Sequence, residues 1–276
     1  MSDSTVIAEG NVAVITGGAD GIGLAAANYF LGRGMRVCIA DINEEQLASA
    51  AAELGSVLAV PTDVTKMDQV QALKDAVYAE YGQVNLLMNN AGCGYGTSSW
   101  AEYDGWRNTM ELNLFGVVHG QQVFLPAMLE AGLPGMVINT GSKQGITNPP
   151  GDPAYNASKA AIKALTEQLA YELRNIENCA VTAHLLVPGF VYTGLIRRWL
   201  PEKPDGAWWP DEVAQFMGPA LERGDFYIIC PDNDVDRVED NRRMAWAMGD
   251  LIENRPALSR WHPDYAADFE AGRSGS

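Results

Sequence analysis

Residues 12–34 read VAVITGGADGIGLAAANYFLGRG, in which an apolar run leads through a cluster of glycines into a pattern with helical periodicity. A glycine can make the sharp turn from strand to helix, lets the backbone approach a ligand, and permits close packing of helix on sheet. The N-terminus of such a helix favours an anion such as a pyrophosphate. An ordinary glycine-rich turn is the alternative, but the position between an expected strand and an expected helix favours a dinucleotide site. The cofactor-binding residues predicted in this turn are Gly17, Asp20, Gly21, Ile22 and Gly23.

The rest of the chain alternates short, β-branched runs with longer helical patterns. Strands are expected at 12–16, 35–40, 56–61, 85–89, 135–140, 180–188 and 226–231, and helical spacing marks 44–54, 66–82, 161–176 and 238–252. Near-continuous apolar runs are typical of strands covered on both faces. The alternation predicts an α/β fold, a Rossmann-type doubly wound parallel sheet in one three-layer αβα domain.

We expect this single domain to span residues 1–276. Its dinucleotide-binding core would cover about 10–190, a substrate loop about 190–215, and a C-terminal strand, helix and tail 225–276. Beyond residue 252 no clear period is present, so this tail is expected to wrap the surface or fray.

Composition excludes several classes of partner. The formal net charge of −16 argues against nucleic acid and anionic membranes, because no excess of Lys and Arg exists to neutralise phosphates. The first residues have neither a basic region nor an apolar run, so a cytoplasmic protein is expected. Three histidines without a pair at ligand spacing predict no metal site, and four widely spaced cysteines predict free thiols.

Asp41 ends the second expected strand. A carboxylate there can accept hydrogen bonds from both hydroxyls of an adenosine ribose and would repel a 2′-phosphate. Asp20 and Ile42 supply no cation for a phosphorylated ribose, so the cofactor predicted here is NAD, with Asp41 and Ile42 at its ribose. The alternative is that Asp41 caps the helix beginning near Asn43.

Tyr155 and Lys159 lie four residues apart in a helical pattern, so both side chains project from one face. A phenol is a poor base at neutral pH, but a nearby ammonium and a positive nicotinamide ring would favour phenolate. Tyr155 could then take the hydroxyl proton of an alcohol while a hydride leaves for a cofactor. Ser142 follows the fifth expected strand, at the edge where open α/β sheets bind ligands.

These motifs occur in the order typical of the short-chain dehydrogenase/reductase family, which the chain resembles over roughly residues 10–230. The residues that carry the resemblance are TGGADGIG (16–23), Asp63-Val64, NNAG (89–92), Asn113, Ser142, YNASK (155–159) and PGFVYT (188–193). An array of this length is highly specific.

The resemblance implies four catalytic positions, Asn113, Ser142, Tyr155 and Lys159. Ser142 would hold the substrate oxygen, and Tyr155 would exchange its proton. Lys159 would bind the nicotinamide ribose and lower the pKa of Tyr155, while Asn113 would anchor a water that continues the proton path.

The resemblance also assigns further cofactor contacts. Asp63 and Val64 would line the adenine pocket, and Asn90, Ala91 and Gly92 would line the cofactor cleft. The nicotinamide end would be bounded by Pro188, Gly189, Val191 and Thr193. Asn89 is expected to stabilise the sheet edge instead, and Lys163 is expected to be a solvated helix residue.

The predicted reaction is hydride transfer between NAD(H) and a secondary alcohol or ketone, hydrophobic or aromatic in character. Trp199, Trp208 and Trp209 suit an apolar pocket or lid, and packing against a neighbouring subunit or the domain itself is the alternative. With Ser142 and Tyr155, the predicted substrate-binding residues are Tyr95, Gln144 and Trp199.

Two rival functions are an NADPH-dependent carbonyl reductase and a non-catalytic nucleotide-binding protein. Carbon–carbon or isomerase chemistry on a sugar nucleotide is a third, although relatives with that chemistry usually have longer C-terminal regions. The resemblance implies a homodimer or homotetramer paired through the helices that contain Asn113 and Tyr155. The segment after the last expected strand departs from the glycine-rich stretch of many tetrameric relatives, which leaves dimer and tetramer open. Trp261, His262 and Tyr265 could close over a site, with surface packing as the alternative.

Overall fold

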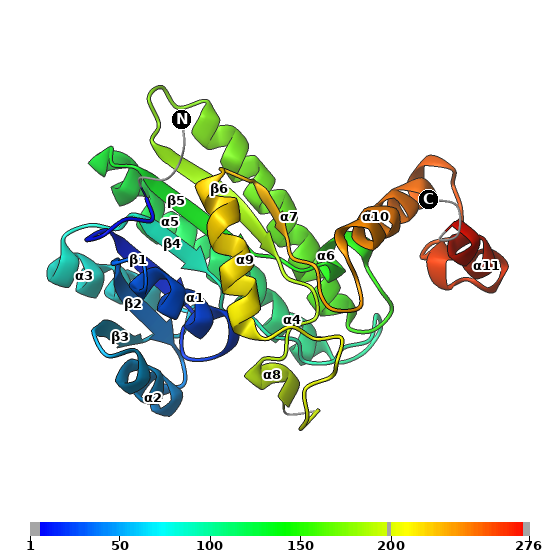
Figure 1. Ribbon diagram of the computed structural model, residues 1–276, viewed down its shortest axis with the longest axis horizontal. Coiled ribbons are helices and arrows are strands. Elements are labelled where there is room, and N and C mark those ends of the chain that lie inside the picture. Colours follow the sequence, from blue (N-terminus) through cyan, green and yellow to red (C-terminus); the bar gives the residue numbers. More distant parts are fainter. Residues whose placement is uncertain (1–5, 198–199, 273–276) are drawn as a thin grey trace.

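One parallel sheet organises the chain, in the order β3-β2-β1-β4-β5-β6-β7 (Figure 1). The computed structural model describes residues 6–197 and 200–272. Its strands are β1 (Val12–Thr16), β2 (Arg36–Asp41), β3 (Val57–Pro61), β4 (Leu86–Asn89), β5 (Gly135–Thr140), β6 (Val181–Val187) and β7 (Tyr227–Ile229). All neighbouring strands pair in parallel, so the doubly wound Rossmann-type sheet is confirmed.

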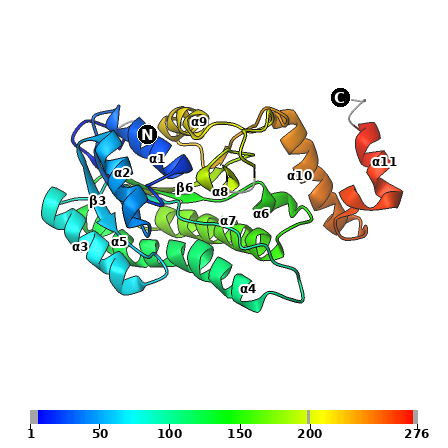
Figure 2. The ribbon, with the colours of Figure 1, turned by 90° about the horizontal axis from the view of Figure 1, so that it is seen from below.

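Helices cover both faces of the sheet (Figure 2). They are α1 (Gly21–Leu31), α2 (Glu44–Leu54), α3 (Met67–Tyr81), α4 (Tyr103–Met110), α5 (Gly116–Ala131), α6 (Gln144–Thr147), α7 (Pro153–Arg174), α8 (Gly194–Arg197), α9 (Pro210–Glu222), α10 (Arg237–Ile252) and α11 (Pro263–Ala271). A π-helical turn, Glu111–Phe115, joins α4 to α5, and a 3-10 turn, Ser259–Trp261, precedes α11. Within the described ranges, no helix is long and apolar enough to cross a membrane.

The strands bury side chains on both faces, as their continuous apolar runs predict. Ala13 and Ile15 of β1 belong to a core shared with α1 and α9. Val12 and Val14 of the same strand belong to a core shared with α3, α5 and α7. This alternation places β1 between two helical layers, with its carboxyl end opening toward the glycine-rich turn.

Helix α9 begins inside the segment that the sequence predicts as a substrate loop, about 190–215. Pro210 occupies its first turn, and the Glu212 carboxylate accepts a hydrogen bond from the Trp209 amide at 2.7 Å. Trp208 packs against the core beside α1, so for this tryptophan the packing alternative holds. Trp209 stays half-exposed and meets the ring of Tyr192 edge-on, with centroids 5.7 Å apart.

The C-terminal arm, residues 237–271, extends away from the sheet beyond α6 (Figure 1). Of the two expectations for the tail, fraying was wrong for residues 259–271, because they form the 3-10 turn and α11. Pro263 starts α11, and the His262 imidazole accepts a hydrogen bond from the Asp264 amide. The ring of Trp246 in α10 packs edge-on against Phe269 of α11 at 5.2 Å, which holds the two helices together.

Candidate active site

The glycine-rich turn connects β1 to α1 through backbone that leaves no room for side chains. Gly17 and Gly21 adopt left-handed conformations, with φ of +63° and +55°. A Cβ at Gly17 would lie 2.9 Å from the Ala91 Cα, and a Cβ at Gly23 would overlap the Gly17 carbonyl. The predicted residues of this turn therefore form a bare backbone surface at the N-terminus of α1, while Ile22 packs against the core.

Asn90 joins the glycine-rich turn to the carboxyl end of β4. Its amide donates to the Thr16 hydroxyl at 3.0 Å, and its side chain donates to the Gly17 carbonyl at 3.3 Å. The Ala91 amide shares the Thr16 hydroxyl at 3.2 Å. Chain connections diverge on either side of β1 and β4, and open α/β sheets bind ligands at such a switch point.

Asp41 stands at the carboxyl end of β2, beside the glycine-rich turn. Its carboxylate accepts hydrogen bonds from the amides of Ala19 at 3.3 Å and Asn43 at 3.0 Å. The alternative role for Asp41, capping α2, is wrong, because the side chain of Asn43 provides that cap. Ile42 is 68% exposed next to Asp41, so it presents an apolar surface beside the carboxylate.

Asp63 and Val64 follow β3 at the same edge of the sheet. The Asp63 carboxylate accepts a hydrogen bond from the Thr65 amide at 2.9 Å and thereby orders the turn. Val64 is buried against Gly116, where a Cβ would lie 2.8 Å from a Val64 methyl. Gly116 thus allows α5 to approach this turn closely.

The segment from Pro188 to Thr193 follows β6 and reaches the glycine-rich turn. A Cβ at Gly21 would lie 3.0 Å from the Thr193 methyl, so the two segments are in contact. Val191 is buried and forms a bridge with Trp208. Directly after this segment, Arg197 in α8 pairs with Asp20 at 3.1 Å, a contact that the sequence did not suggest.

Tyr155 is the third residue of α7, and its side chain lies against Ser142, which follows β5. Burial raises the pKa of Tyr155, and a hydrogen bond with Ser142 opposes that rise. The Ser142 hydroxyl also accepts a hydrogen bond from the Gln144 amide at 3.2 Å. A lowering of this pKa by Lys159 stays a prediction.

Lys159 is buried one helical turn beyond Tyr155. Its Nζ lies 5.6 Å from the centre of the Tyr155 ring and donates to the Thr140 carbonyl at 2.8 Å. Burial lowers the pKa of Lys159 to about 8. A Cβ at Gly92 would lie 3.4 Å from this Nζ, so Gly92 packs close to the ammonium.

Asn113 is buried in the π-helical turn between α4 and α5. Its side chain accepts from the Cys93 amide and donates to the Cys93 carbonyl, both at 2.9 Å. A third bond runs to the Ser158 hydroxyl at 2.9 Å. Asn113 therefore clamps the loop after β4 onto α7, and π-helical turns are frequent at functional sites.

Asp152 is a site residue that the sequence reasoning missed. It caps α7 and accepts hydrogen bonds from the amides of Gly96 at 3.0 Å and Thr97 at 3.2 Å. Burial opposes ionisation, but the hydrogen bonds from Thr97 and nearby amides hold the pKa of Asp152 below its usual range. The pair Asp152-Pro153 in the sequence could have predicted this cap, because Asp is a good N-cap and Pro favours the first helical turn.

Lys143, the neighbour of Ser142, was also missed. Its ammonium pairs with Asp240 of α10 at 2.8 Å and with Asp232 at 3.3 Å. The Asp232 carboxylate in turn accepts from the Phe190 amide at 3.2 Å. This buried triad fixes the turn of Ser142, the segment after β6 and the C-terminal arm to one another.

The predicted substrate residues lie in different surroundings. Gln144 and Tyr95 are exposed near Ser142 and on the Asp152-bound loop, respectively. Trp199 lies outside the described residues. Trp261 of the C-terminal arm lines a separate pocket with α6, so the structure does not bring it to Tyr155.

The remaining expectations concern structural residues. Asn89 donates to the Asn139 side chain at 2.9 Å, inside the sheet. Lys163 is partly exposed and pairs with Glu167 at 2.7 Å. Within the described ranges, Cys38, Cys93, Cys179 and Cys230 form no disulfide.

Comparison with known proteins gives concordant matches. The short chain dehydrogenase family model matches residues 11–204. A 3beta-hydroxysteroid dehydrogenase 2 of Eggerthella lenta is 35% identical over 67% of this chain and 73% of its own. A CLA biosynthesis dehydrogenase/reductase of Lactiplantibacillus plantarum is 33% identical over 92% and 88%. A short chain dehydrogenase/reductase of Burkholderia phymatum, crystallised with NAD, superposes with a TM-score of 0.82 at 34% identity, covering 90% of this chain and 96% of that one.

Proposed function

This chain belongs to the short-chain dehydrogenase/reductase family of oxidoreductases, and from that premise we propose that it transfers a hydride between NAD(H) and an apolar secondary alcohol or ketone. The observation that carries the proposal is the contact of Tyr155 with Ser142, one helical turn from the buried Lys159. This group lies at the sheet edge to which the glycine-rich turn also belongs.

The chain fits a dinucleotide at that edge. The bare backbone at Gly17, Gly21 and Gly23 and the amides at the start of α1 would hold the pyrophosphate. The Asp20 carboxylate caps the Gly21 amide at 2.7 Å, and its pairing with Arg197 offsets a negative charge that would otherwise oppose the phosphates.

Other residues would hold the two ends of the dinucleotide. Asp41 would accept hydrogen bonds from the adenosine ribose, with Ile42, Asp63 and Val64 around the adenine. Asn90, Ala91 and Gly92 would line the cleft. Pro188, Gly189, Val191 and Thr193 would bound the nicotinamide end. The negative charge of Asp41 supports NAD over NADP, because it would repel a 2′-phosphate.

In the oxidation direction, Ser142 would donate a hydrogen bond to the alcohol oxygen and hold it beside Tyr155. The Tyr155 oxygen, as phenolate, would take the hydroxyl proton, and the carbonyl would form as the hydride leaves the same carbon. The cofactor supplies the hydride acceptor when it is bound. Lys159 would stabilise the phenolate while it carries its own charge, which it loses as the pH rises through about 8.

Asn113 and Asp152 would position this group. Asn113 ties the loop after β4 to α7 through its three hydrogen bonds. Asp152 fixes the start of α7, from which Tyr155 projects. Removing either would shift the Tyr155 oxygen relative to Ser142, and small displacements of reacting groups reduce rates strongly.

An apolar or aromatic substrate is supported by the side chains that flank the site. Tyr95 stands on the loop that Asp152 holds, and Leu195 and Ile196 of α8 are half-buried on the opposite segment. Apolar walls with a few polar groups are typical of small-molecule sites. The fit of Gln144 and Tyr95 to the substrate is part of the proposal.

A screen of NAD reduction across aliphatic, alicyclic, aromatic, steroid and sugar alcohols tests the proposed function. We expect the highest kcat/KM with a bulky apolar secondary alcohol. Activity confined to sugar alcohols would contradict the proposed substrate class. A higher kcat/KM with NADP than with NAD would contradict the cofactor assignment and favour a carbonyl reductase.

We also propose that the protein works as a homodimer or homotetramer. Phe115 and Tyr171 are exposed on the helices that the family resemblance places at a subunit contact. A second uncharged surface lies on α10, where Val238, Met248 and Ile252 are each more than half exposed. Two copies of a chain with a net charge of −16 repel each other, so uncharged surfaces are the regions best suited to self-association.

A further inference from the structure

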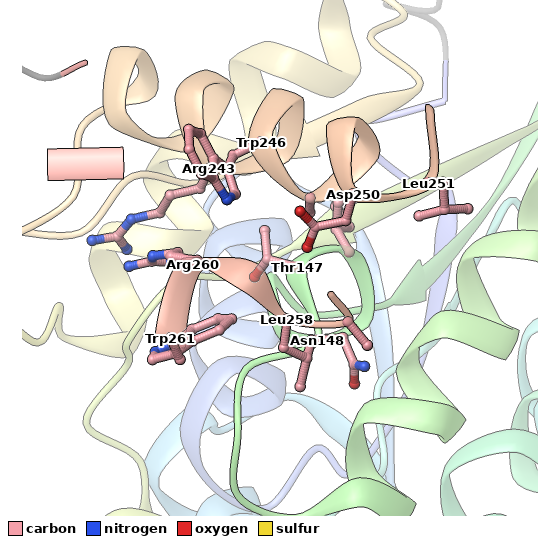
Figure 3. A pocket seen from close by; sticks show the side chains of 12 residues that line it. Thr147, Asn148, Arg243, Trp246, Asp250, Leu251, Leu258, Arg260 and Trp261 are labelled. Atoms are coloured by element: carbon pink, nitrogen blue, oxygen red, sulfur yellow. The ribbon is translucent and has the colours of Figure 1, made fainter. Parts of the chain in front are cut away.

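A pocket of about 230 Å³ lies between α6 and the C-terminal arm, separate from the residues assigned to the cofactor and the reaction (Figure 3). Its walls are mostly apolar and include Ile146 of α6, Trp246 and Ala247 of α10, and Leu258 and Trp261 of the 3-10 turn region. This volume is just below the range typical of small-molecule sites, so it suits a small ligand.

One face of α10 forms a wall of the pocket. Arg243, Trp246, Ala247 and Asp250 line it at spacings of three and four residues. Asp250 is already engaged, because it pairs with Arg255 at 3.0 Å and accepts the Ser259 amide at 3.0 Å. The helical period places the exposed residues Met248 and Ile252 on a different face, so self-association through them would leave the pocket open.

Two arginines lie together at one end of the pocket, as Figure 3 shows. The Arg243 Nε forms an ion pair with the Glu239 carboxylate at 2.7 Å, and the Arg242 Nε forms a second one with the same carboxylate at 2.8 Å. Arg260 stacks over the Trp261 ring at 4.8 Å. The Arg260 guanidinium is thereby held against an aromatic ring that lines the pocket.

The electrostatics of this end favour an anion. Burial lowers the pKa of Arg260, as do the charges of Arg243 and Arg242, while Glu239 and Glu270 oppose that effect. Three guanidinium groups thus face two carboxylates, in a chain whose overall formal charge is −16. A bound anion would relieve the repulsion between Arg243 and Arg260, and planar guanidinium groups match carboxylates well.

We propose that this pocket is a second ligand site that binds a small amphipathic carboxylate. The apolar body would lie against Trp246, Leu258 and Trp261, and the carboxylate would lie between Arg243 and Arg260. The wall formed by Ile146 belongs to a helix that begins two residues after Ser142, so an occupied pocket would contact the element next to the reaction site.

Isothermal titration calorimetry of the full chain with 2-naphthoate tests the proposal, with the uncharged 2-naphthamide as the matched probe. We expect 2-naphthoate to bind at least tenfold more tightly, because the amide has the same apolar body and lacks the charge. Equal affinities, or no heat with either probe at millimolar concentration, would overturn the proposal.

Variants then locate the binding. Arg243→Gln and Arg260→Gln should each weaken 2-naphthoate about tenfold and leave 2-naphthamide nearly unchanged. Ala247→Phe fills the pocket with the charges intact and should remove binding of both probes. The control Arg223→Gln removes an exposed arginine paired with Asp225 elsewhere on the surface and should change nothing.

Two further measurements keep these variants interpretable. Urea unfolding midpoints establish that each variant is folded. If Arg260→Gln unfolds the C-terminal arm, Ala247→Phe still tests the pocket, because it keeps both arginines. Retention of 2-naphthoate binding in Ala247→Phe would place the ligand elsewhere and refute the site. If sedimentation velocity shows that 2-naphthoate dissociates an oligomer, the pocket is instead filled by a second copy of the chain, which also refutes it.

Discussion

Replacing Lys143 by Met should destabilise the fold strongly, because it removes the cation of a buried ion triad. The exposed fractions of the side chains are 16% for Lys143, 7% for Asp232 and 6% for Asp240. Loss of one partner from a buried ion pair costs about 3–5 kcal/mol, since it leaves an uncompensated charge. For a domain of this size, that corresponds to a fall in Tm of about 6–20 °C.

The loss should depend on pH. Burial raises the pKa of Asp240, whereas its hydrogen bond and charge interaction with Lys143 lower it. Without Lys143 that pKa rises further above its value in the unfolded chain. A group with a raised folded pKa stabilises the fold below its unfolded pKa, and this contribution is lost as the pH rises through the folded pKa. Lys143→Met should therefore be less damaging at pH 5 than at pH 8.

Urea unfolding followed by tryptophan fluorescence at both pH values measures this effect. The double variant Lys143→Met/Asp240→Asn should recover part of the stability at pH 8, because one buried carboxylate is gone. Asp240→Asn alone keeps the contact of Lys143 with Asp232 and should lose less than Lys143→Met. A loss below about 1 kcal/mol, or an equal loss at both pH values, would refute the assignment of the triad as a buried charge cluster.

The remaining predictions concern the cofactor, the substrate and the assembly. Asp41→Asn should lower kcat/KM for NAD about tenfold or more, because a hydrogen bond to a charged group contributes about 1.5–3 kcal/mol, and raise kcat/KM for NADP. An unchanged ratio of the two kcat/KM values in steady-state assays would remove Asp41 from the ribose site. Tyr95→Ala should reduce kcat/KM for a bulky aromatic alcohol several-fold while sparing 2-propanol, and equal effects on both would exclude a substrate contact. Met248→Glu should weaken self-association in sedimentation velocity without changing the unfolding midpoint, whereas an unaltered sedimentation coefficient would show that α10 lies outside the interface.

Most of the fold could be predicted from local sequence patterns. Short, mostly apolar runs mark the strands, and the glycine-rich turn identifies the first βα unit. The end of the chain was harder, since α11 is short and its apolar residues gain their partners from α10 and the 3-10 turn. Phe269 is buried against Trp246 of α10, and this contact between two separate helices cannot be read from the spacing of apolar residues within either one.

The candidate site could be predicted where a motif is contiguous. Tyr155 and Lys159 share a helix, so their common face follows from spacing alone. The partners of Lys143 come from a loop and a helix about 90 residues later, and only the tertiary structure determines that they meet. The π-helical turn that contains Asn113 could not be predicted from the sequence either, because the apolar residues around Asn113 fit an ordinary α-helix equally well.

The most direct test of the central claim is the rate of NADH formation by wild type and Tyr155→Phe, with the fastest alcohol of the screening panel. The variant keeps the aromatic ring and loses only the hydroxyl for which we propose proton exchange. We predict a fall in kcat of at least about a thousandfold, in keeping with the size of acid–base effects combined with loss of substrate positioning, while the Kd for NADH changes less than threefold. Turnover by Tyr155→Phe within tenfold of wild type would contradict the proposed mechanism.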